Sequence, residues 1–138
     1  MKKILLLSMF LVTVGLNTIQ AQSNDLNTTQ TVTSVGIVIY SNDTETVWNA
    51  LRLANYSKSE GDTVCVFLLG KGVEVDNLVK ENNDIKEQVD QLLVNGGVIL
   101  GCGTCLQSRN NSEPMVCKFS SMKDLYELIR KSKVVLTF

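Results

Sequence analysis

Short apolar runs alternate with longer segments of helical periodicity along most of the chain. The runs at 35–40, 63–69 and 98–100 are unbroken and mostly rich in β-branched residues, which is typical of strands buried on both faces. A further run closes the chain at 133–138, and 114–119 is a candidate edge strand. Strands separated by helical segments form a parallel sheet. The pattern therefore predicts an α/β domain with a mostly parallel sheet of four or five strands and helices on both faces.

The segments between these runs carry helix signals. Asn42 with Glu45, and Ser121 with Asp124, have the spacing of a capping box, which marks a helix start. Gly61 is placed to end the first helix, because glycine is favoured just after a helix. We expect helices beginning near Asn42, over 77–95, over 106–110 and beginning near Ser121.

The N-terminal region has the features of a signal peptide over residues 1–21. Lys2 and Lys3 precede a mostly apolar stretch at 4–16, which is too short for a normal membrane span, and Ala21 ends a plausible cleavage site. A buried N-terminal helix or an uncleaved anchor is the alternative. Residues 22–34 are polar and predict a flexible leader, so the folded domain is expected over 35–138. We therefore expect an exported, periplasmic protein with no stable membrane anchor after cleavage.

Charge and composition exclude several function classes. The 138 residues include 13 basic and 14 acidic side chains, a balance that gives no reason to expect nucleic acid as a partner. The chain has no histidine, which removes the commonest general base, the commonest zinc ligand and every Cys-His or Ser-His catalytic pair. The best candidate for chemistry is the cysteine pair Cys102 and Cys105.

A CxxC motif, Cys102 to Cys105, follows the third apolar run directly. Reactive groups of parallel sheets lie at the carboxyl ends of strands. A helix start favours the thiolate, so we expect the pKa of Cys102 to be lowered and Cys102 to be alkylated first. Gly101 and Gly103 would allow close backbone approach to the partner of the sulfur. An inert buried pair or a structural disulfide is the alternative interpretation of the same spacing.

The other cysteines and a glycine pair have simpler interpretations. Cys65 lies inside the second apolar run and is expected to be a buried small hydrophobe, whereas Cys117 lies in the uncertain edge segment and can be exposed. Zinc is a poor fit, because these two cysteines stand alone and no histidine supports them. Gly70 and Gly72 follow the second run without the spacing of a phosphate loop, so we expect a turn there.

Three stretches resemble the DsrE/DsrF-like family. They are GIVIYSNDTETVWNALRLANYSKSEGDTVCVFLLGKGVEV, VILGCGTCLQSRN and KDLYELIRKSKVVLTF, which together span most of 35–138. TusD-type and DsrE-type members carry a sulfur-accepting cysteine at the end of the third strand, which matches Cys102, and an arginine near the end of the next helix, which matches Arg109. Asn110 stands where the family usually has glycine, and asparagine tolerates left-handed backbone angles.

The resemblance implies a flavodoxin-like sheet, assembly into trimers or hexamers, and persulfide transfer without a metal or organic cofactor. The preferred hypothesis is a sulfur carrier, and a possible sulfurtransferase, in which Cys102 accepts sulfane sulfur and Cys105 resolves it. Gly101, Gly103, Thr104 and Arg109 would support the pair. The partners would be sulfur donor and acceptor proteins or small sulfane-sulfur species. A thiol–disulfide oxidoreductase using the same pair and a non-catalytic oligomeric binding module are the alternatives.

Overall fold

The computed structural model describes residues 31–138. The expected signal peptide, 1–21, and most of the expected leader lie outside the described residues. Just before the first strand, the Thr33 N–H donates a hydrogen bond to Asp62 Oδ1 at 2.8 Å, which ties the start of the domain to the segment after the first helix. Within residues 31–138 no helix is long and apolar enough to cross a membrane.

Five strands form one sheet in which every neighbouring pair is parallel. The spatial order is β4-β3-β2-β1-β5, so the three strongest apolar runs are the three central strands. This confirms the predicted parallel α/β sheet. The strands are β1 (Ser34–Ile39), β2 (Thr63–Leu68), β3 (Val98–Cys102), β4 (Lys118–Ser120) and β5 (Val134–Thr137).

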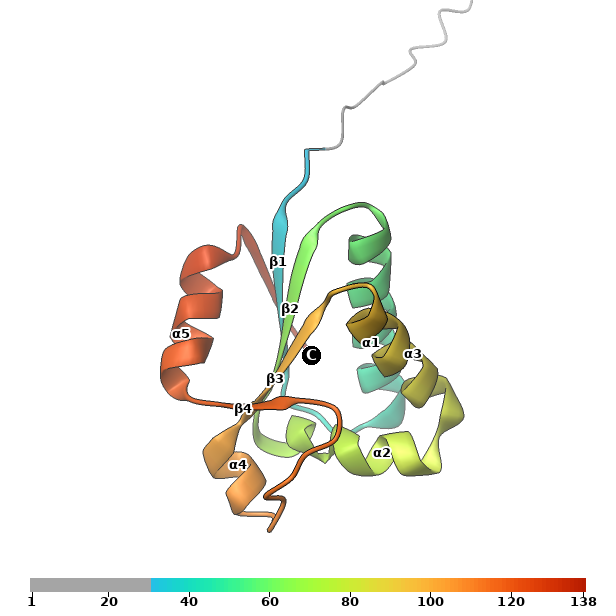
Figure 1. The fold of residues 1–138 in the computed structure, drawn as a ribbon, viewed down its shortest axis with the longest axis vertical. Coiled ribbons are helices and arrows are strands. Elements are labelled where there is room, and N and C mark those ends of the chain that lie inside the picture. Colours follow the sequence, from blue (N-terminus) through green and yellow to red (C-terminus); the bar gives the residue numbers. More distant parts are fainter. Residues whose placement is uncertain (1–30) are drawn as a thin grey trace, which may run out of the picture.

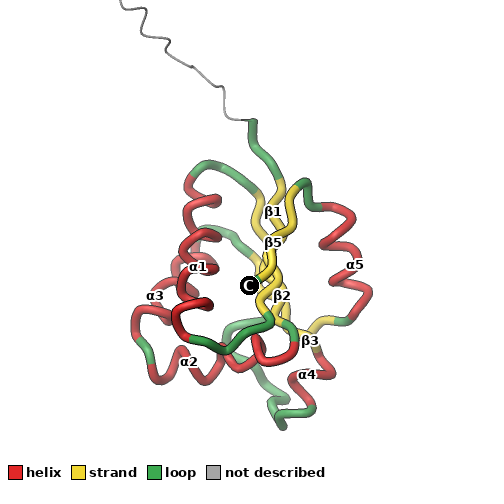
Figure 2. Tube along the Cα trace, turned by 180° about the vertical axis from the view of Figure 1, so that it is seen from behind, coloured by secondary structure: helices red, strands yellow, loops and turns green. Residues whose placement is uncertain are grey.

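Helices cover both faces of the sheet, as Figures 1 and 2 show. The helices α1 (Thr44–Ser59), α2 (Val75–Glu81) and α3 (Asn83–Val94) lie on one side, and α5 (Met122–Lys131) lies on the other. Two short elements, the 3-10 turn η1 (Gly70–Glu74) and the helix α4 (Gly103–Gln107), lie at the end of the sheet where β1, β2 and β3 finish.

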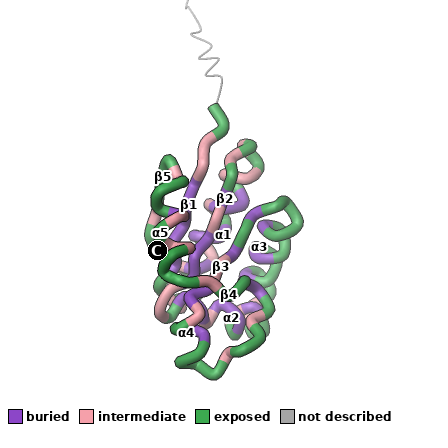
Figure 3. Tube along the Cα trace, turned by 60° about the vertical axis from the view of Figure 1, so that its left-hand side comes forward, coloured by how far each residue is buried: buried purple, intermediate pink, exposed green. Residues whose placement is uncertain are grey.

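The core lies between the sheet and the α1–α3 layer, and Figure 3 shows buried backbone running through the middle of the domain. Burial of apolar side chains is the main driving force for this arrangement. The buried helical residues share one face of each helix, with a period of 3.6. The fully buried strand residues are Ile37, Ile39, Val66 and Phe67, and the buried helix residues include Val47, Leu51, Ala54, Ile85, Val89 and Leu92.

Two helix boundaries differ from the sequence prediction. The first helix is capped by Asp43 and not by Asn42: Asp43 Oδ1 accepts from the Thr46 N–H at 2.9 Å. The single helix expected over 77–95 is two helices, because Asn82 adopts an extended conformation and its side chain accepts from the backbone N–H groups of the following turn. Gly61 follows α1 with a φ of 92°, as expected for a residue that ends a helix.

The chain after the third strand also differs from the prediction. β3 continues to Cys102, and α4 begins at Gly103, so the helix expected over 106–110 starts earlier. The edge strand expected over 114–119 is shorter and is confined to β4. The buried Asp76 explains why the first part of this segment is not a strand. Its carboxylate accepts from the backbone N–H groups of Met115 and Val116, at 3.0 Å each, and so holds them in a loop.

The last helix begins at the predicted capping box. The backbone N–H of Ser121 donates to Asp124 Oδ2 at 2.7 Å, and α5 starts at the next residue. This helix approaches β1 closely because Gly36 has no side chain, and a Cβ there would overlap Leu128 and Ser132. α5 therefore packs over β1, whereas the β2 and β3 side of this face is less covered.

Candidate functional site

The two motif cysteines lie at the carboxyl end of β3. Cys102 is the last residue of the strand and the cap of α4, and Cys105 lies within α4. In parallel sheets this end gathers the loops that follow each strand. Figure 1 shows α4 beyond the end of β3, beside the segment that follows β2. The predicted position of the thiol pair is therefore where a flavodoxin-like sheet places its chemistry.

The two thiols differ in exposure, and the difference is opposite to our expectation. Cys102 is only 3% exposed, whereas Cys105 is partly exposed. Burial raises the pKa of Cys102, and a hydrogen bond with the Cys105 side chain raises it further. The backbone N–H groups of Thr104 and Cys105 act in the opposite direction but do not outweigh burial. The predicted lowering of the Cys102 pKa is therefore wrong.

Cys105 has the hydrogen-bond donor that we expected for Cys102. The backbone N–H of Gly70 donates to Cys105 Sγ at 3.3 Å, across 35 residues of sequence. Gly70 has a φ of 55°, a conformation that glycine adopts without strain. The predicted turn at Gly70 is present as η1, and it has a role that the sequence did not reveal: it points a backbone donor at a motif sulfur.

Arg109 joins α4 to η1. Its Nε donates to Glu74 Oε1 at 2.7 Å, and its Nη1 donates to the Cys105 carbonyl at 3.2 Å. Asn42 Nδ2 donates to the other oxygen of Glu74 at 2.8 Å. The bond from Arg109, followed by the bond from Asn42, holds the pKa of the Glu74 carboxyl below its usual value. One ion pair and its hydrogen bonds therefore link η1 and Asn42 to the backbone carbonyl of Cys105.

The motif glycines make room for protein neighbours. A Cβ at Gly101 would overlap Cys117 Sγ, and a Cβ at Gly103 would crowd the Ser120 carbonyl and the Phe119 ring. We expected these glycines to admit the partner of the sulfur. Instead they allow β4 and the preceding loop to pack closely against the end of β3, which helps to bury Cys102.

All four cysteines are free thiols. Cys117 is buried, contrary to the expectation that it can be exposed, and burial together with the nearby charge of Asp76 raises its pKa to about 12. Cys65 is only partly buried, and burial raises its pKa. Among residues 31–138 no group of three or more histidine, cysteine or acidic side chains is placed to hold a metal ion.

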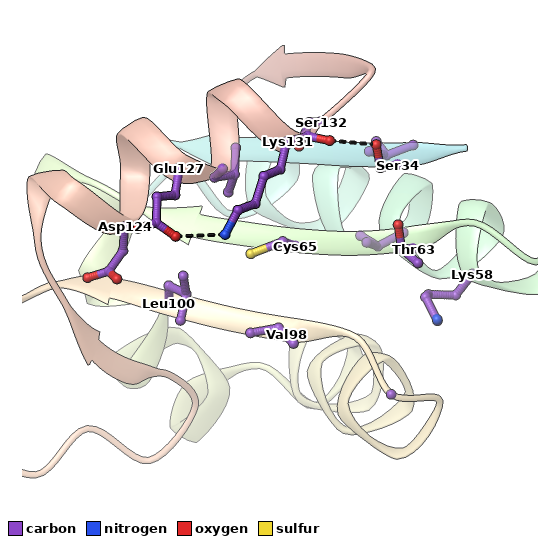
Figure 4. Close-up of a pocket in the computed structure, with 14 residues that line it drawn as sticks. Ser34, Lys58, Thr63, Cys65, Val98, Leu100, Asp124, Glu127, Lys131 and Ser132 are labelled. Atoms are coloured by element: carbon purple, nitrogen blue, oxygen red, sulfur yellow. Dashed lines mark hydrogen bonds and ion pairs between the residues drawn. The ribbon is translucent and has the colours of Figure 1, made fainter. Parts of the chain in front are cut away.

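A separate cavity of about 440 Å³ lies between α5 and the sheet. Figure 4 shows Cys65 pointing into it, between Lys131 of α5 and Val98 of β3. Its wall is mainly apolar, with Leu100 continuing the floor and the Lys131–Glu127 ion pair at the helix side. No residue from 101 to 105 lines this cavity, so it is not part of the thiol site.

Sequence analysis missed several residues of the site. Glu74, which pairs with Arg109, and Asp76, which is 4% exposed, belong to no motif that the sequence analysis singled out. Asn42 was assigned to a cap and instead contacts Glu74. Asn42 and Gly70 closely follow β1 and β2, so the topology of a parallel sheet was a signal that could have brought them to Cys105.

The arrangement suits nucleophilic chemistry at sulfur. A partly exposed thiol accepts a backbone hydrogen bond, and a buried second thiol lies within hydrogen-bonding reach of it. A donor N–H stabilises a thiolate, which is the reactive form of cysteine. A neighbouring thiol can attack a group that the first sulfur carries.

Comparison with known proteins agrees with this architecture. Two solved structures share the fold: the ychN protein from E. coli and the conserved protein of unknown function BT1422 from Bacteroides thetaiotaomicron. The first has 20% identity and a TM-score of 0.68, over 78% of this chain and 100% of its own. The second has 19% identity and a TM-score of 0.64, over 77% and 95%. The comparison with curated proteins finds no match.

The family comparison covers nearly all of the described domain. The family model matches residues 33–138, from just before β1 to the last residue. This range includes the CxxC motif, the η1 turn and Arg109, and so confirms the resemblance at the level of the family. On this evidence, the chain belongs to the DsrE/DsrF-like family.

Proposed function

We propose that this protein is a persulfide-handling sulfur carrier of the TusD and DsrE type that works through Cys102 and Cys105. Membership of the family suggests a role related to sulfur relay. The observation that carries the finer assignment is the hydrogen bond from the Gly70 N–H to Cys105 Sγ, on the more exposed of the two thiols. It favours Cys105 as the thiol that accepts sulfur, with Cys102 as the resolving thiol, which reverses the roles expected from the sequence.

Loading is a displacement at sulfur. The Cys105 thiolate attacks the outer sulfur of a donor persulfide, R–S–SH. A bond forms between Cys105 Sγ and that sulfur, the S–S bond of the donor breaks, and its electron pair leaves with the R–S⁻ thiolate. The product is a Cys105 persulfide, and no external oxidant or reductant is needed.

Two fates of the Cys105 persulfide conserve atoms and electrons. An acceptor thiolate can attack the outer sulfur, which gives an acceptor persulfide and returns Cys105 as a thiolate beside the Gly70 N–H. Without an acceptor, Cys102 can attack Cys105 Sγ, which forms the Cys102–Cys105 disulfide and releases hydrosulfide. The buried Cys102, with its raised pKa, is a slow nucleophile, and this favours transfer to an acceptor over internal discharge.

Intact mass after loading tests the proposal. Reduced protein is treated with glutathione persulfide and weighed at intervals. The wild-type protein should gain one sulfur atom, Cys105→Ala should gain none, and Cys102→Ala should gain one and keep it longer because the resolving thiol is absent. Cys65→Ala is the control and should behave as wild type. Normal loading of Cys105→Ala would overturn the assignment.

A thiol–disulfide oxidoreductase is the second candidate. The CxxC spacing supports it, because Cys102 caps α4 and Cys105 lies three residues later in the same helix. The same mass measurement separates the two functions: the oxidoreductase loses two hydrogens in an oxidising thiol buffer and gains no sulfur from the persulfide. If neither change occurs in the folded protein, the motif is structural and the non-catalytic binding module is favoured.

We also propose that the protein is exported to the periplasm and assembles as a homo-oligomer, a trimer or a hexamer. Its sulfur partners would be donor and acceptor proteins or small sulfane-sulfur species. Lys2, Lys3, the apolar stretch at 4–16 and Ala21 support export. N-terminal sequencing of protein from the cell envelope should begin at Gln22, and recovery of an intact Met1 would contradict cleavage.

A further inference from the structure

The turn η1 makes two contacts with the segment after β3, one with Cys105 of α4 and one with Arg109, which follows α4. At one end of the turn, the Gly70 N–H donates to Cys105 Sγ at 3.3 Å. At the other end, Glu74 Oε1 accepts from Arg109 Nε at 2.7 Å. Arg109 in turn donates to the Cys105 carbonyl at 3.2 Å. The turn is thus joined to α4 by a hydrogen bond at the sulfur and to Arg109, just after α4, by an ion pair.

Glu74 joins the segments that follow three strands. Its second oxygen accepts from Asn42, which follows β1, while η1 follows β2 and Arg109 belongs to the segment after β3. The ion pair is about one-third exposed at both side chains, so it is not a buried core element. An ion pair of this exposure contributes little to global stability. Its position suggests a local role.

The position of the Gly70 amide depends on contacts made by other residues of η1. Glycine has no side chain to anchor its own backbone, and Gly70 has a φ that it can leave readily. A hydrogen bond from a neutral amide to a thiolate weakens steeply when distance or angle degrades. A small movement of Gly70, the first residue of η1, away from α4 would therefore cost Cys105 its donor, while the buried Val73 of the same turn stays in the core.

We propose that Glu74 is a positioning residue: its ion pair with Arg109 keeps the Gly70 amide on the Cys105 sulfur and so sustains the reactivity of that thiol. The role rests on the proposed function, in which Cys105 is the accepting thiol. Glu74 touches neither sulfur by any hydrogen bond in the described chain. It acts through Arg109 and through the backbone of η1.

A purely electrostatic role for the pair makes a different prediction. Removing the Glu74 charge alone would favour a nearby thiolate, whereas removing the Arg109 charge would disfavour it. If the ion pair instead acts as a brace, meaning that it holds η1 in place against the segment after β3, losing either partner lets η1 shift and weakens the Gly70 hydrogen bond. The two variants then change the thiol in the same direction. The direction in which Glu74→Gln changes the alkylation of Cys105 therefore separates the two mechanisms.

The test is the pH profile of iodoacetamide alkylation at Cys105, followed by peptide mass in reduced, folded protein. For both Glu74→Gln and Arg109→Gln we expect the midpoint of the profile to move to higher pH. The rate at neutral pH should fall about threefold to tenfold, as expected from weakening one hydrogen bond to a charged group. The double variant should be no slower than either single one, and Arg109→Lys should recover part of the rate.

An exposed ion pair elsewhere in the fold provides the control. Lys86→Gln and Asp90→Asn remove an exposed ion pair of α3 and should leave the profile unchanged. Midpoints that move in opposite directions in Glu74→Gln and Arg109→Gln, or that do not move, would overturn the proposal. Alkylation needs no sulfane sulfur, so the brace is tested even if persulfide loading fails. Normal loading with unshifted midpoints would instead refute the brace alone.

Discussion

The backbone of Gly72 lies directly against the carbonyl oxygen of Ile39. A Cβ at residue 72 would overlap that oxygen, which belongs to the last residue of β1 and cannot move without disturbing the sheet. This contact sets how closely η1 approaches β1. It therefore helps to determine where the Gly70 amide and Glu74 lie.

We predict that Gly72→Ala displaces η1. The variant should lose about 2 kcal/mol of unfolding free energy in urea, since the added carbon forces a backbone shift. Alkylation of Cys105 should slow in the same protein. Lys71→Ala is the matched control, because Lys71 is exposed in the same turn, and it should change neither quantity. An unchanged Gly72→Ala would show that η1 can move without cost.

We predict that Cys105 is the first cysteine to be alkylated in the native protein near neutral pH. It is more exposed than Cys102 and accepts the Gly70 hydrogen bond, whereas burial raises the pKa of Cys102. Brief iodoacetamide treatment followed by peptide mass gives the order directly. Urea-unfolded protein should label all four cysteines at similar rates. Earlier labelling of Cys102 would restore the assignment expected from the sequence.

We predict that Asp76 stabilises the loop before β4. Its carboxylate accepts from Asn111 Nδ2 at 2.8 Å and from two backbone N–H groups, and it is 4% exposed. Asp76→Asn keeps the shape but turns an amide N–H toward those donors, and it should cost about 2–3 kcal/mol in urea unfolding. Asp90→Asn, on an exposed helix face, should cost less than about 0.5 kcal/mol. Equal losses in both variants would contradict a structural role for Asp76.

We predict that stability falls at alkaline pH partly through Cys117. Its folded pKa is about 12, above the ~8.5 of an unfolded thiol. A raised folded pKa gives stability that is complete below the unfolded pKa and is lost as pH rises toward the folded one. Between pH 9 and pH 11 this thiol can remove at most about 1.4 kcal/mol per pH unit. Unfolding in urea with a reductant should show a shallower loss for Cys117→Ala, and identical slopes would exclude the contribution.

We predict that the face beneath α5 takes part in the proposed homo-oligomer. Val98 is 39% exposed and lines the cavity, whose wall is mainly apolar, so this face offers apolar surface to a partner copy. Val98→Glu should shift the protein to monomer in light scattering. Val94→Glu is the matched control, since Val94 is 85% exposed on α3 on the other side of the sheet. Oligomers that survive Val98→Glu would place the interface elsewhere.

The three central strands were predictable because burial on both faces leaves a direct mark on sequence. The runs at β1, β2 and β3 contain almost no polar side chain, and the parallel central sheet followed from them. The break at Asn82 was harder to predict, since residues on both sides keep a helical period. Only the side-chain cap that Asn82 supplies to α3 interrupts it.

The roles within the site were less predictable for a physical reason. A helix start lowers a thiol pKa only when the sulfur stays solvated enough to be charged, and the sequence does not state how β4 and its loop bury Cys102. Gly70 donates the hydrogen bond to Cys105, and Glu74 forms the ion pair with Arg109. Gly70 and Glu74 are both distant in sequence from the motif. Local motif reasoning located the pair but did not reveal which thiol the fold leaves accessible.

The parallel direction of the sheet separates the two ends of the domain by the full length of β1. Ser34 begins β1 at one end, and the thiols lie where β3 finishes at the other. A protein immobilised on beads through its N-terminal side would therefore turn the thiol end of the sheet, with the partly exposed Cys105, toward the solution. A fusion partner placed before residue 33 should leave thiol access unhindered, which makes that end the natural choice for a pull-down of sulfur donors and acceptors.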